Sequence, residues 1–340
     1  MIPELNLNKK VFIVAEIGNN HEGSISNAKK MIDLAKDAGA DCVKFQTIKP
    51  NELIKKSDKA RINQLKKFEL KKKDFFELYD YAKKKEILFS STPFYLSSVK
   101  WLSEIVCFFK VSSGDFTFFP LIKELFKYDK PIFISTGMVT SSEIFNFFDY
   151  FKEDLKNFKK QLCLMYCISD YPTNKKLINL NSINFLSQFC DFPGFSDHSI
   201  GINFAVDSIS FGAKVIEKHF TLDKNFSDFR DHKISLDYTE FKKMVKEIRK
   251  AEQERIYVKQ NKAHKKTITP DEKKNRKLFR RGIYAKKNIE KGKKIKINDL
   301  IFLRPKLEGI SPAKVNLFLD KISSKRIYEG ELMDLTMVKN

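Results

Sequence analysis

Two histidines, His198 and His219, each lie in a short apolar run, over residues 193–199 and 214–221. Both runs have the length and composition of buried strands. If they are neighbouring parallel strands, their carboxyl ends lie together and the two imidazoles meet there. Such a pair would bind a divalent metal ion with room for water and substrate, whereas a histidine by itself is more often structural. Catalytic zinc usually takes three protein ligands, so two histidines with oxygen ligands favour Mn²⁺, with Mg²⁺ or Co²⁺ as alternatives.

Further polar side chains stand near the ends of the apolar runs along the chain. In chain order they are Glu16, Lys44, Gln46, Thr92, Lys110, Ser113, Ser135, Ser169 and Ser196. Lysine supplies a compact positive charge, and serine and threonine donate hydrogen bonds. Brought to one mouth, these side chains would bind an anion that has both a phosphate and a carboxylate group. A single serine is more often a turn or cap residue, but turns do not explain why every run ends in this way.

The elements that must position these side chains alternate between strands and helices. Residues 11–47 have the pattern of a complete strand–helix–strand unit. Further strand-like runs follow at 88–93, 107–114, 131–137, 162–169, 193–199 and 214–221, and the apolar faces of three helices are Ala28, Met31, Ile32, Ala35; Phe75, Leu78, Tyr79, Ala82; and Phe241, Met244, Val245, Ile248. Eight strands in about 250 residues predict an α/β fold, a (β/α)8 TIM barrel. An open doubly wound sheet is the alternative, which is disfavoured because no glycine-rich fingerprint follows the first strand.

The repeat ends near residue 255, and this divides the chain into three parts. Residues 1–255 form the predicted barrel domain, in which the basic stretch 49–73 is expected to be a long loop over the strand ends. Residues 256–277 are polar and basic, and we expect a linker there. Residues 278–340 contain short β-like runs with turn signals, which predict a small, mostly β domain that packs against something else.

The formal net charge of +21 raises the question of nucleic-acid binding. Residues 256–340 hold 23 Lys/Arg against 9 Asp/Glu, so two thirds of the excess lies in the last quarter of the chain. No nucleic-acid-binding motif accompanies it, and we expect a solvated face or a site for anionic substrates instead. The sequence shows no apolar run of membrane-spanning length and no secretory signal. With an odd number of cysteines, five, it predicts a cytoplasmic protein with reduced thiols that binds neither nucleic acid nor membrane.

An ordered set of motifs resembles the sialic acid synthase family, the bacterial nonulosonate synthases with a C-terminal antifreeze-like (SAF) domain. The matching motifs are AEIGNNHEG, VKFQT, SSTPF, KVSSG, STGM, YPT, GFSDHS, EKHFT and DHKISLD, followed by RRGIYAKKNIEKGKKI in the tail. The resemblance covers essentially the whole chain. It implies a TIM barrel followed by a small, mostly β antifreeze-like domain, and the condensation of phosphoenolpyruvate with an N-acetylated amino sugar.

The resemblance also implies roles for individual residues. The positions that match phosphoenolpyruvate-binding residues are Lys44, Thr92, Lys110, Ser113, Ser135 and Ser196, with which we group Ser169, where the family typically carries Asn. His198 and His219 match the metal ligands. The positions that match residues near the amino sugar are Glu16, Gln46, Tyr171 and Asp231. Arg304 matches an arginine that the family's small domain inserts into the partner's barrel, which implies a domain-swapped homodimer.

The implied activity is that of a nonulosonic acid synthase, a phosphoenolpyruvate-dependent transferase that forms a C–C bond. N-acetylmannosamine or a close analogue would give a sialic-acid-like nine-carbon 2-keto acid and phosphate. Glu16, His198 and His219 would be catalytic, with Glu16 either a general base or a hydrogen-bond anchor for sugar hydroxyls. The forms VKFQT and DHKISLD are closer to legionaminate-type synthases, which use a 2,4-diacetamido-trideoxy hexose. A metal-dependent pyruvate aldolase and a non-catalytic ice- or glycan-binding protein are the rival functions.

Overall fold

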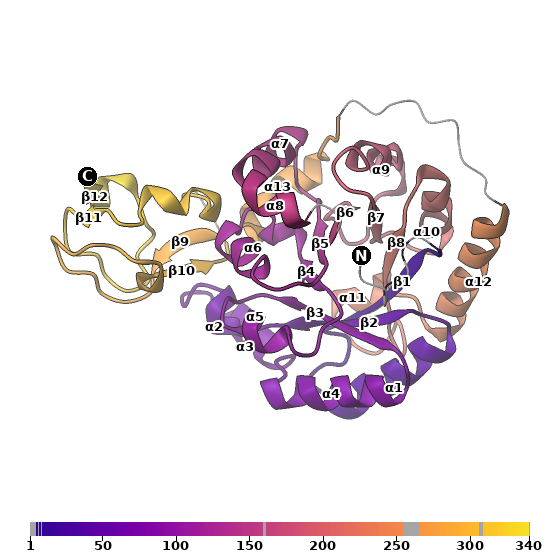
Figure 1. Cartoon of the computed structure of the whole chain (residues 1–340). Coiled ribbons are helices and arrows are strands. Elements are labelled where there is room, and N and C mark those ends of the chain that lie inside the picture. The colour runs from indigo at the N-terminus through magenta and orange to yellow at the C-terminus, as the bar shows by residue number, and fades with distance from the viewer. Residues whose placement is uncertain are drawn as a thin grey trace.

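Eight parallel strands close into a barrel in the computed structural model, which describes residues 5, 7, 9–158, 161–254, 265–305 and 309–339 (Figure 1). The strands are β1 (Phe12–Gly18), β2 (Cys42–Thr47), β3 (Leu88–Pro93), β4 (Phe109–Val111), β5 (Ile132–Ser135), β6 (Leu162–Tyr166), β7 (Gly194–Asp197) and β8 (Val215–His219). Each strand pairs with the next, and β8 pairs with β1, so that Glu16 lies opposite His219. The predicted TIM barrel is therefore confirmed. Several strands end before the apolar run does, because the run continues into the following loop.

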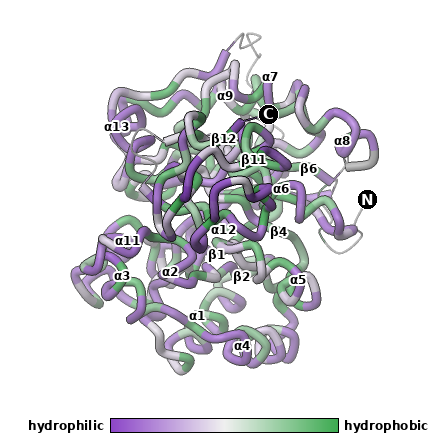
Figure 2. The backbone as a smooth tube through the Cα atoms, turned by 90° about the vertical axis from the view of Figure 1, so that its left-hand side faces the viewer, coloured by the Kyte–Doolittle hydropathy of each residue, from purple (hydrophilic) through white to green (hydrophobic). Residues whose placement is uncertain are grey.

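Helices follow the strands and surround the barrel. They are α1 (Ile25–Asp37), α2 (Pro50–Leu53), α3 (Lys59–Lys66), α4 (Lys72–Lys84), α5 (Ser98–Leu102), α6 (Phe119–Leu125), α7 (Ser141–Tyr150), α8 (Lys152–Phe158), α9 (Asn181–Leu186), α10 (Asn203–Asp207), α11 (Arg230–Ile234) and α12 (Tyr238–Glu254). The predicted apolar faces of α1 and α12 are buried in full, and that of α4 is buried except for Tyr79, which is half-buried. Figure 2 shows hydrophilic and hydrophobic residues alternating along α1 and α4, as expected of helices with one face on the barrel.

The stretch 49–73 is not the long loop that the sequence predicts, because it contains α2, α3 and the start of α4. Pro50 opens α2, where its fixed φ suits the first helical turn, and the Asp58 side chain caps α3. Ile62 and Leu65 of α3 are buried in a small apolar cluster that also holds Ile48, Leu53, Ile54, Phe68 and Phe94. Lysines between these apolar positions hide the helical pattern in the sequence.

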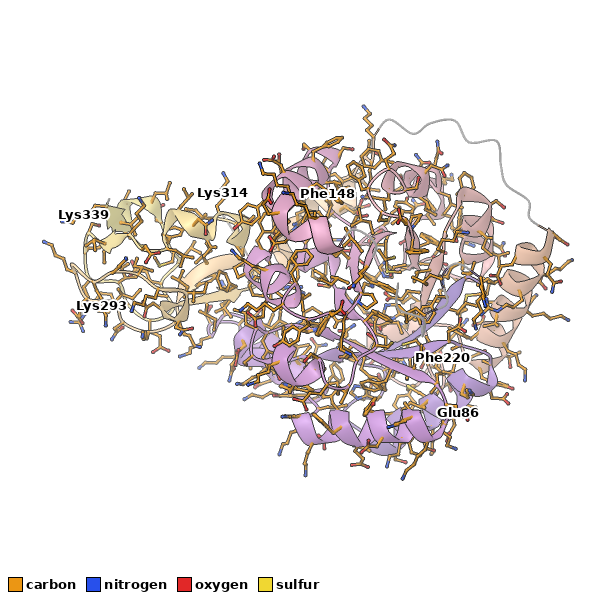
Figure 3. The ribbon with its side chains drawn as sticks, viewed as in Figure 1. Glu86, Phe148, Phe220, Lys293, Lys314 and Lys339 are labelled. Carbon is orange, nitrogen blue, oxygen red and sulfur yellow. The ribbon has the colours of Figure 1, made fainter. Side chains whose placement is uncertain are left out.

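A small β-rich region follows the barrel, as predicted. It contains β9 (Gly282–Ala285) paired with β10 (Leu300–Leu303), and β11 (Ile322–Ser323) paired with β12 (Val338–Lys339). The region projects from the side of the barrel where α2 and α6 lie (Figure 1). Most of its lysines are exposed, among them Lys293, Lys314 and Lys339 at the labelled positions of Figure 3. Much of the positive charge in this region therefore belongs to a solvated face.

The expected linker, 256–277, differs from the structure in its second half. Residues 255–264 lie outside the described ranges, but α13 (Pro270–Phe279) occupies most of the stretch from 265 to 279. Thr269 and Glu272 form a capping box at the start of this helix. Lys266 and Glu272 are both buried. The sequence hides this element because the residue that α13 buries is a glutamate and not part of an apolar stripe.

The five cysteines are free thiols, four of them buried and Cys107 half-buried, in agreement with the prediction. Burial raises the pKa of the Cys190 thiol to about 12, so this group remains protonated. No helix in the described part of the chain is long and apolar enough to cross a membrane.

Candidate active site

The interior of the barrel is apolar at its amino-terminal end. Phe108 and Phe133 stack with ring centroids 4.0 Å apart, and Phe12 meets both rings edge-on. Side chains alternate between the inside and the outside of the barrel along each strand. The next inward positions toward the carboxyl ends carry polar groups, so a layer of buried charges lies above a dry floor. This end of a (β/α)8 barrel is where active sites form.

Two lysines and two glutamates form a buried ion-pair network in this layer. Lys44 Nζ lies 2.6 Å from Glu16 and 3.6 Å from Glu217, and it donates to the Thr92 hydroxyl at 3.1 Å. Lys110 Nζ donates to both carboxylate oxygens of Glu217 at 2.7 Å. All four charged side chains are at most 6% exposed. The network fixes both ammonium groups in place and leaves the layer without a net charge.

Glu217 is the member of this network that was not predicted from the sequence. It lies within the EKHFT motif, two residues before His219, and also accepts a hydrogen bond from Ser196 at 2.9 Å. Strand alternation could have found it, because residues two apart on β8 face the same side. Glu217 does not stand at a strand end, because it lies one inward position below His219 on β8.

The pKa values of Glu16 and Glu217 are shifted in opposite directions by their surroundings. Burial raises the pKa of Glu16, the charge of Glu217 adds to this, and the ion pair with Lys44 opposes it. For Glu217, burial alone would raise the pKa, but the charges of Lys110 and Lys44 outweigh it and hold the pKa well below its usual range. Glu217 is therefore a permanent carboxylate, whereas Glu16 is the group suited to exchanging a proton.

The two predicted histidines meet at the ends of β7 and β8, with ring centroids 5.7 Å apart. His198 Nδ1 donates to the Ile168 carbonyl at 2.8 Å, so its Nε2 carries the lone pair, with Ser196 Oγ 3.5 Å away. Within the described residues, the buried Nδ1 of His219 has no hydrogen-bond partner. Burial lowers the pKa of His198 to about 4 and that of His219 to about 3, so both rings are neutral, as metal ligation requires.

These two imidazoles fit a divalent ion, but they do not form a complete protein site. Among the described residues, no group of three or more His, Cys, Asp or Glu side chains is spaced to hold a metal. An ion on His198 and His219 would take its other ligands from water and substrate, as expected from the residue types.

Two of the predicted serines, Ser113 and Ser169, lie close to Gly137, in the loop after β5. The Gly137 N–H donates to Ser113 Oγ at 3.1 Å and to Cys167 Sγ at 3.2 Å. A Cβ atom at Gly137 would lie 2.2 Å from Ser169 Oγ and 2.7 Å from Ser113 Oγ, so this close approach requires glycine. Ser135, at the end of β5, is also buried. In the described structure the buried Ser169 hydroxyl has no partner, which leaves it free for a ligand.

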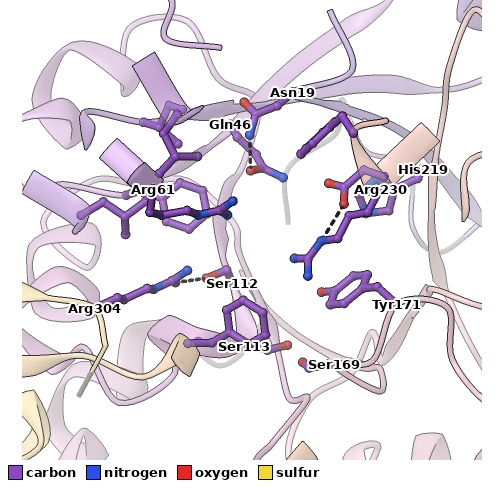
Figure 4. Close-up of a pocket in the computed structure, with 18 of the residues that line it drawn as sticks. Asn19, Gln46, Arg61, Ser112, Ser113, Ser169, Tyr171, His219, Arg230 and Arg304 are labelled. Carbon is purple, nitrogen blue, oxygen red and sulfur yellow. Dashed lines mark hydrogen bonds and ion pairs between the residues drawn. The ribbon is translucent and has the colours of Figure 1, made fainter. Parts of the chain in front are cut away.

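A cavity of about 140 Å³ opens above this layer (Figure 4). Four of the residues predicted to bind the amino sugar line this cavity, namely Gln46, Tyr171, Asp231 and Arg304. Glu16 lies just beneath, and it accepts a hydrogen bond from Gln46 at 3.0 Å. Within the described ranges, the lining also contains buried atoms without a hydrogen-bond partner, namely Asn19 Oδ1 and Arg304 Nε. Buried polar atoms normally have partners, so these mark the cavity as a ligand site.

Arg304 reaches this cavity from the same chain in the structure. Its backbone pairs with Leu53 and Lys55, and its guanidinium donates to Asp115 at 2.9 Å and to Ser112 at 3.2 Å. Asp115 is also paired with the buried Arg281, at 2.7 Å. Although burial alone would raise the pKa of Asp115, the two guanidiniums lower it to about 2. One carboxylate thus joins the small β region to the barrel mouth. The expected insertion of Arg304 into a partner's barrel stays a prediction.

Glu272 of α13 holds two loops of the barrel mouth together. Its Oε1 accepts from the backbone N–H of Met138 at 2.7 Å and of Ser169 at 3.1 Å. Asn275 of the same helix donates to the Ser169 carbonyl at 2.8 Å. These loops carry Gly137 and Ser169, so α13 fixes the part of the site where the Ser113 and Ser169 hydroxyls lie. The linker expected over this stretch left no place for such a contact.

We expect Glu272→Ala to cost about 1–3 kcal/mol of stability for each buried N–H left unpaired, and to raise the KM for the ligand that Ser169 binds. Urea unfolding and steady-state kinetics measure the two effects. The matched control is Asp271→Ala, which removes the neighbouring acid, paired at the surface with Lys274 at 3.4 Å. Equal effects of the two substitutions would contradict the role given to Glu272.

The chain is similar to known proteins over most of its length. The model of the NeuB family matches residues 31–260, and that of the SAF domain matches residues 280–339. The chain is 37% identical over 344 residues to N,N'-diacetyllegionaminic acid synthase of Campylobacter jejuni, with 96% of this chain and 99% of that one covered. It is 34% identical over 259 residues to human N-acetylneuraminate-9-phosphate synthase, with 71% and 70% covered.

The fold comparison gives the same relationship. The solved structure of the spore coat polysaccharide biosynthesis protein SpsE of Bacillus subtilis superposes with a TM-score of 0.82 at 29% identity, covering 97% of this chain and 96% of that one. The family model spans more than half of this chain, and each of the two synthases is more than 30% identical to this chain. The chain therefore belongs to the NeuB family of phosphoenolpyruvate-dependent nonulosonic acid synthases and carries the SAF domain at its C-terminal end.

Proposed function

We propose that this protein condenses phosphoenolpyruvate with an acetamido aldose to give a nine-carbon 2-keto acid and phosphate. N-acetylmannosamine or a close analogue is the proposed acceptor, and a 2,4-diacetamido-trideoxy hexose is the alternative, favoured by the legionaminate relative. One observation carries the proposal: in the described structure, Ser169 Oγ, His219 Nδ1 and Arg304 Nε are buried without a hydrogen-bond partner, and their residues line a single cavity directly above the lysine–glutamate network.

Phosphoenolpyruvate is proposed to bind at the floor of this cavity. Lys44 and Lys110 supply two ammonium groups that their carboxylate partners already hold in place. The hydroxyls of Thr92, Ser113, Ser135, Ser169 and Ser196 donate the remaining hydrogen bonds. Because these groups are fixed before substrate arrives, they can place the enol carbon close to the aldehyde without a further ordering cost.

The sugar is proposed to lie above, with its aldehyde toward the histidine pair. Gln46, Tyr171, Asp231 and Arg304 bind it, and a divalent ion on His198 and His219, for which Mn²⁺ is our choice, would supply Lewis acidity at the aldehyde oxygen. C3 of phosphoenolpyruvate attacks the carbonyl carbon, water adds at C2, and phosphate leaves. Glu16, whose pKa burial raises, either takes the proton of the water or anchors sugar hydroxyls.

The test of this proposal is phosphate release from phosphoenolpyruvate in the presence of N-acetylmannosamine, the 2,4-diacetamido analogue or the pseudaminate precursor. We expect release that requires both substrates and yields a 2-keto acid. A pyruvate aldolase would instead consume free pyruvate and release no phosphate. A non-catalytic glycan-binding protein would show no turnover with any of the sugars.

The proposed oligomer is a domain-swapped homodimer, in which the contacts of Arg304 form between two chains instead of within one. Arg304→Ala and His219→Ala proteins, each inactive alone, are unfolded and refolded together. If Arg304 acts in trans, a mixed dimer contains one complete site, and about a quarter of wild-type activity returns. In the single chain, Arg304 contacts Asp115 of its own barrel. If Arg304 acts within its own chain in this way, both barrels of a mixed dimer stay defective and no activity returns.

A further inference from the structure

Three arginines face one another across the cavity above the histidine pair. Arg61 comes from α3, Arg230 from the start of α11, and Arg304 from the end of β10, and all three line both the inner cavity and a wider opening of about 380 Å³ outside it. In Figure 4 the guanidinium ends of Arg61 and Arg230 point toward the centre of the cavity from opposite sides. Arg61 and Arg230 were not among the residues predicted from the sequence.

These guanidiniums are not balanced by carboxylates at the cavity. Among the described acidic residues, Asp231 alone lines the inner part, where its Oδ1 lies 3.4 Å from Arg230 Nε. Asp115 is shared between Arg304 and Arg281. Arg61 has no ion pair in the described part of the chain; its guanidinium donates to the Gln64 side chain. Asp58 and Asp228 line only the outer opening, and Asp58 is used as the cap of α3.

The three arginines differ in burial and in their neighbours. The Arg230 side chain is 51% exposed, and its guanidinium lies 4.9 Å from the centre of the Tyr171 ring and 5.6 Å from that of Phe279, within the range of cation–π contacts. Arg304 is 12% exposed and lies 5.2 Å from the Phe94 ring. Burial lowers the pKa of Arg61, and the charges of Arg230 and Arg304 lower it further. The three guanidiniums therefore repel one another, and an anion bound between them would offset this repulsion.

We propose that Arg61, Arg230 and Arg304 form an anion subsite for the acceptor sugar. Of the acceptors in the proposed function, this subsite favours a close analogue of N-acetylmannosamine that carries a phosphate or carboxylate at the end remote from its aldehyde, over N-acetylmannosamine itself and the 2,4-diacetamido-trideoxy hexose, which are neutral. This inference rests on the proposed function, because the aldehyde end is placed by the histidine pair at the bottom of the same cavity. The opposite end of the sugar then points to the arginines. Guanidinium forks suit phosphate and carboxylate oxygens, and they remain charged at any working pH.

Phosphoenolpyruvate is the other anion in the reaction, but its proposed position lies below the arginines. The network of Lys44 and Lys110 and the hydroxyl cluster around Gly137 lie at the strand ends, whereas Arg61 and Arg230 come from helices above them. The arginines are therefore available to a group on the second substrate.

The first test compares kcat/KM for N-acetylmannosamine, its 6-phosphate, the corresponding uronic acid and the 2,4-diacetamido-trideoxy sugar. We expect at least one of the two charged sugars to be favoured over both neutral ones by about tenfold or more, and Arg61→Gln and Arg230→Gln each to reduce that preference about tenfold. The matched control is Arg326→Gln, which removes an exposed guanidinium of the small β region, paired with Glu290 at 3.3 Å, and should leave the preference unchanged.

The results that overturn the inference differ from those that overturn the proposed function. A neutral sugar used as well as the charged ones would overturn the subsite while leaving the synthase activity intact. A rise in the KM for phosphoenolpyruvate in Arg61→Gln, with the sugar preference unchanged, would assign the arginines to that substrate instead. If no sugar supports phosphate release, calorimetric binding of the 6-phosphate and of neutral N-acetylmannosamine decides the matter. Tighter binding of the 6-phosphate that Arg61→Gln removes supports the subsite, and equal binding rejects it.

Discussion

Replacing His219 by Ala is expected to lower turnover on the order of 10³-fold or more and to remove bound metal, because Lewis-acid stabilisation contributes several kcal/mol to the transition state. The structure gives the reason for this sensitivity. His219 and His198 are neutral, buried and 5.7 Å apart, and no third protein ligand stands near them in the described residues. Loss of either ring leaves a single ligand. Chelation of the wild-type protein should have the same effect, and added Mn²⁺ should restore activity.

The control for this prediction is another buried histidine. His21 accepts a hydrogen bond from the Gly23 N–H at 3.0 Å and serves its loop, so His21→Asn, which keeps a side-chain acceptor, should retain the metal. Metal content measured by atomic emission and rates measured by phosphate release give the two readouts. A His219→Ala protein with near-normal metal content and rate would contradict the assignment.

Alanine in place of Glu217 is expected to lower the free energy of unfolding of the barrel by about 3–5 kcal/mol, because it leaves a buried ammonium group without its partner. Both hydrogen bonds that Lys110 donates in the described structure go to Glu217. Lys44 retains Glu16 as a partner, so the loss falls mainly on Lys110. The kcat/KM for phosphoenolpyruvate should fall as well, since Lys110 is no longer held in place.

The single tryptophan, Trp101 of α5, allows the unfolding of the barrel to be followed by fluorescence in urea. The control is Glu77→Ala, which breaks a surface pair with Lys29 and should change the stability by about 1 kcal/mol at most. Unfolding of Glu217→Ala at the same urea concentration as the control would show that the buried network does not hold the barrel together.

The barrel could be predicted from sequence because its signals are local. Each strand lies in an apolar run that carries a polar side chain at or near its carboxyl end, and α1 buries Ala28, Met31, Ile32 and Ala35 as their spacing predicts. The closed topology is expected from the number of such units. His198 and His219 were paired in this way, since neighbouring strand ends must meet.

The parts that were missed lack such a signal. The buried contacts of α13 are hydrogen bonds from backbone N–H groups to Glu272. Such a bond leaves no pattern in the sequence, because every residue except proline has a backbone N–H and a single glutamate forms no periodic stripe. Arg61 and Arg230 lie on short helices outside the strands, so nothing in their spacing brings them to one cavity. Their convergence depends on how the segment after β2 and the segment after β8 fold over the barrel mouth, which is a property of tertiary packing.

The most direct test of the proposed reaction is to run it in ¹⁸O-labelled water. If C3 of phosphoenolpyruvate attacks the aldehyde and water then adds at C2, the C–O bond to phosphate breaks. The label should appear at the anomeric carbon of the sugar acid, measured by mass spectrometry, and the released phosphate should remain unlabelled. Label in the phosphate would mean that water attacks phosphorus, and it would contradict the mechanism built on Lys44, Lys110 and the histidine pair.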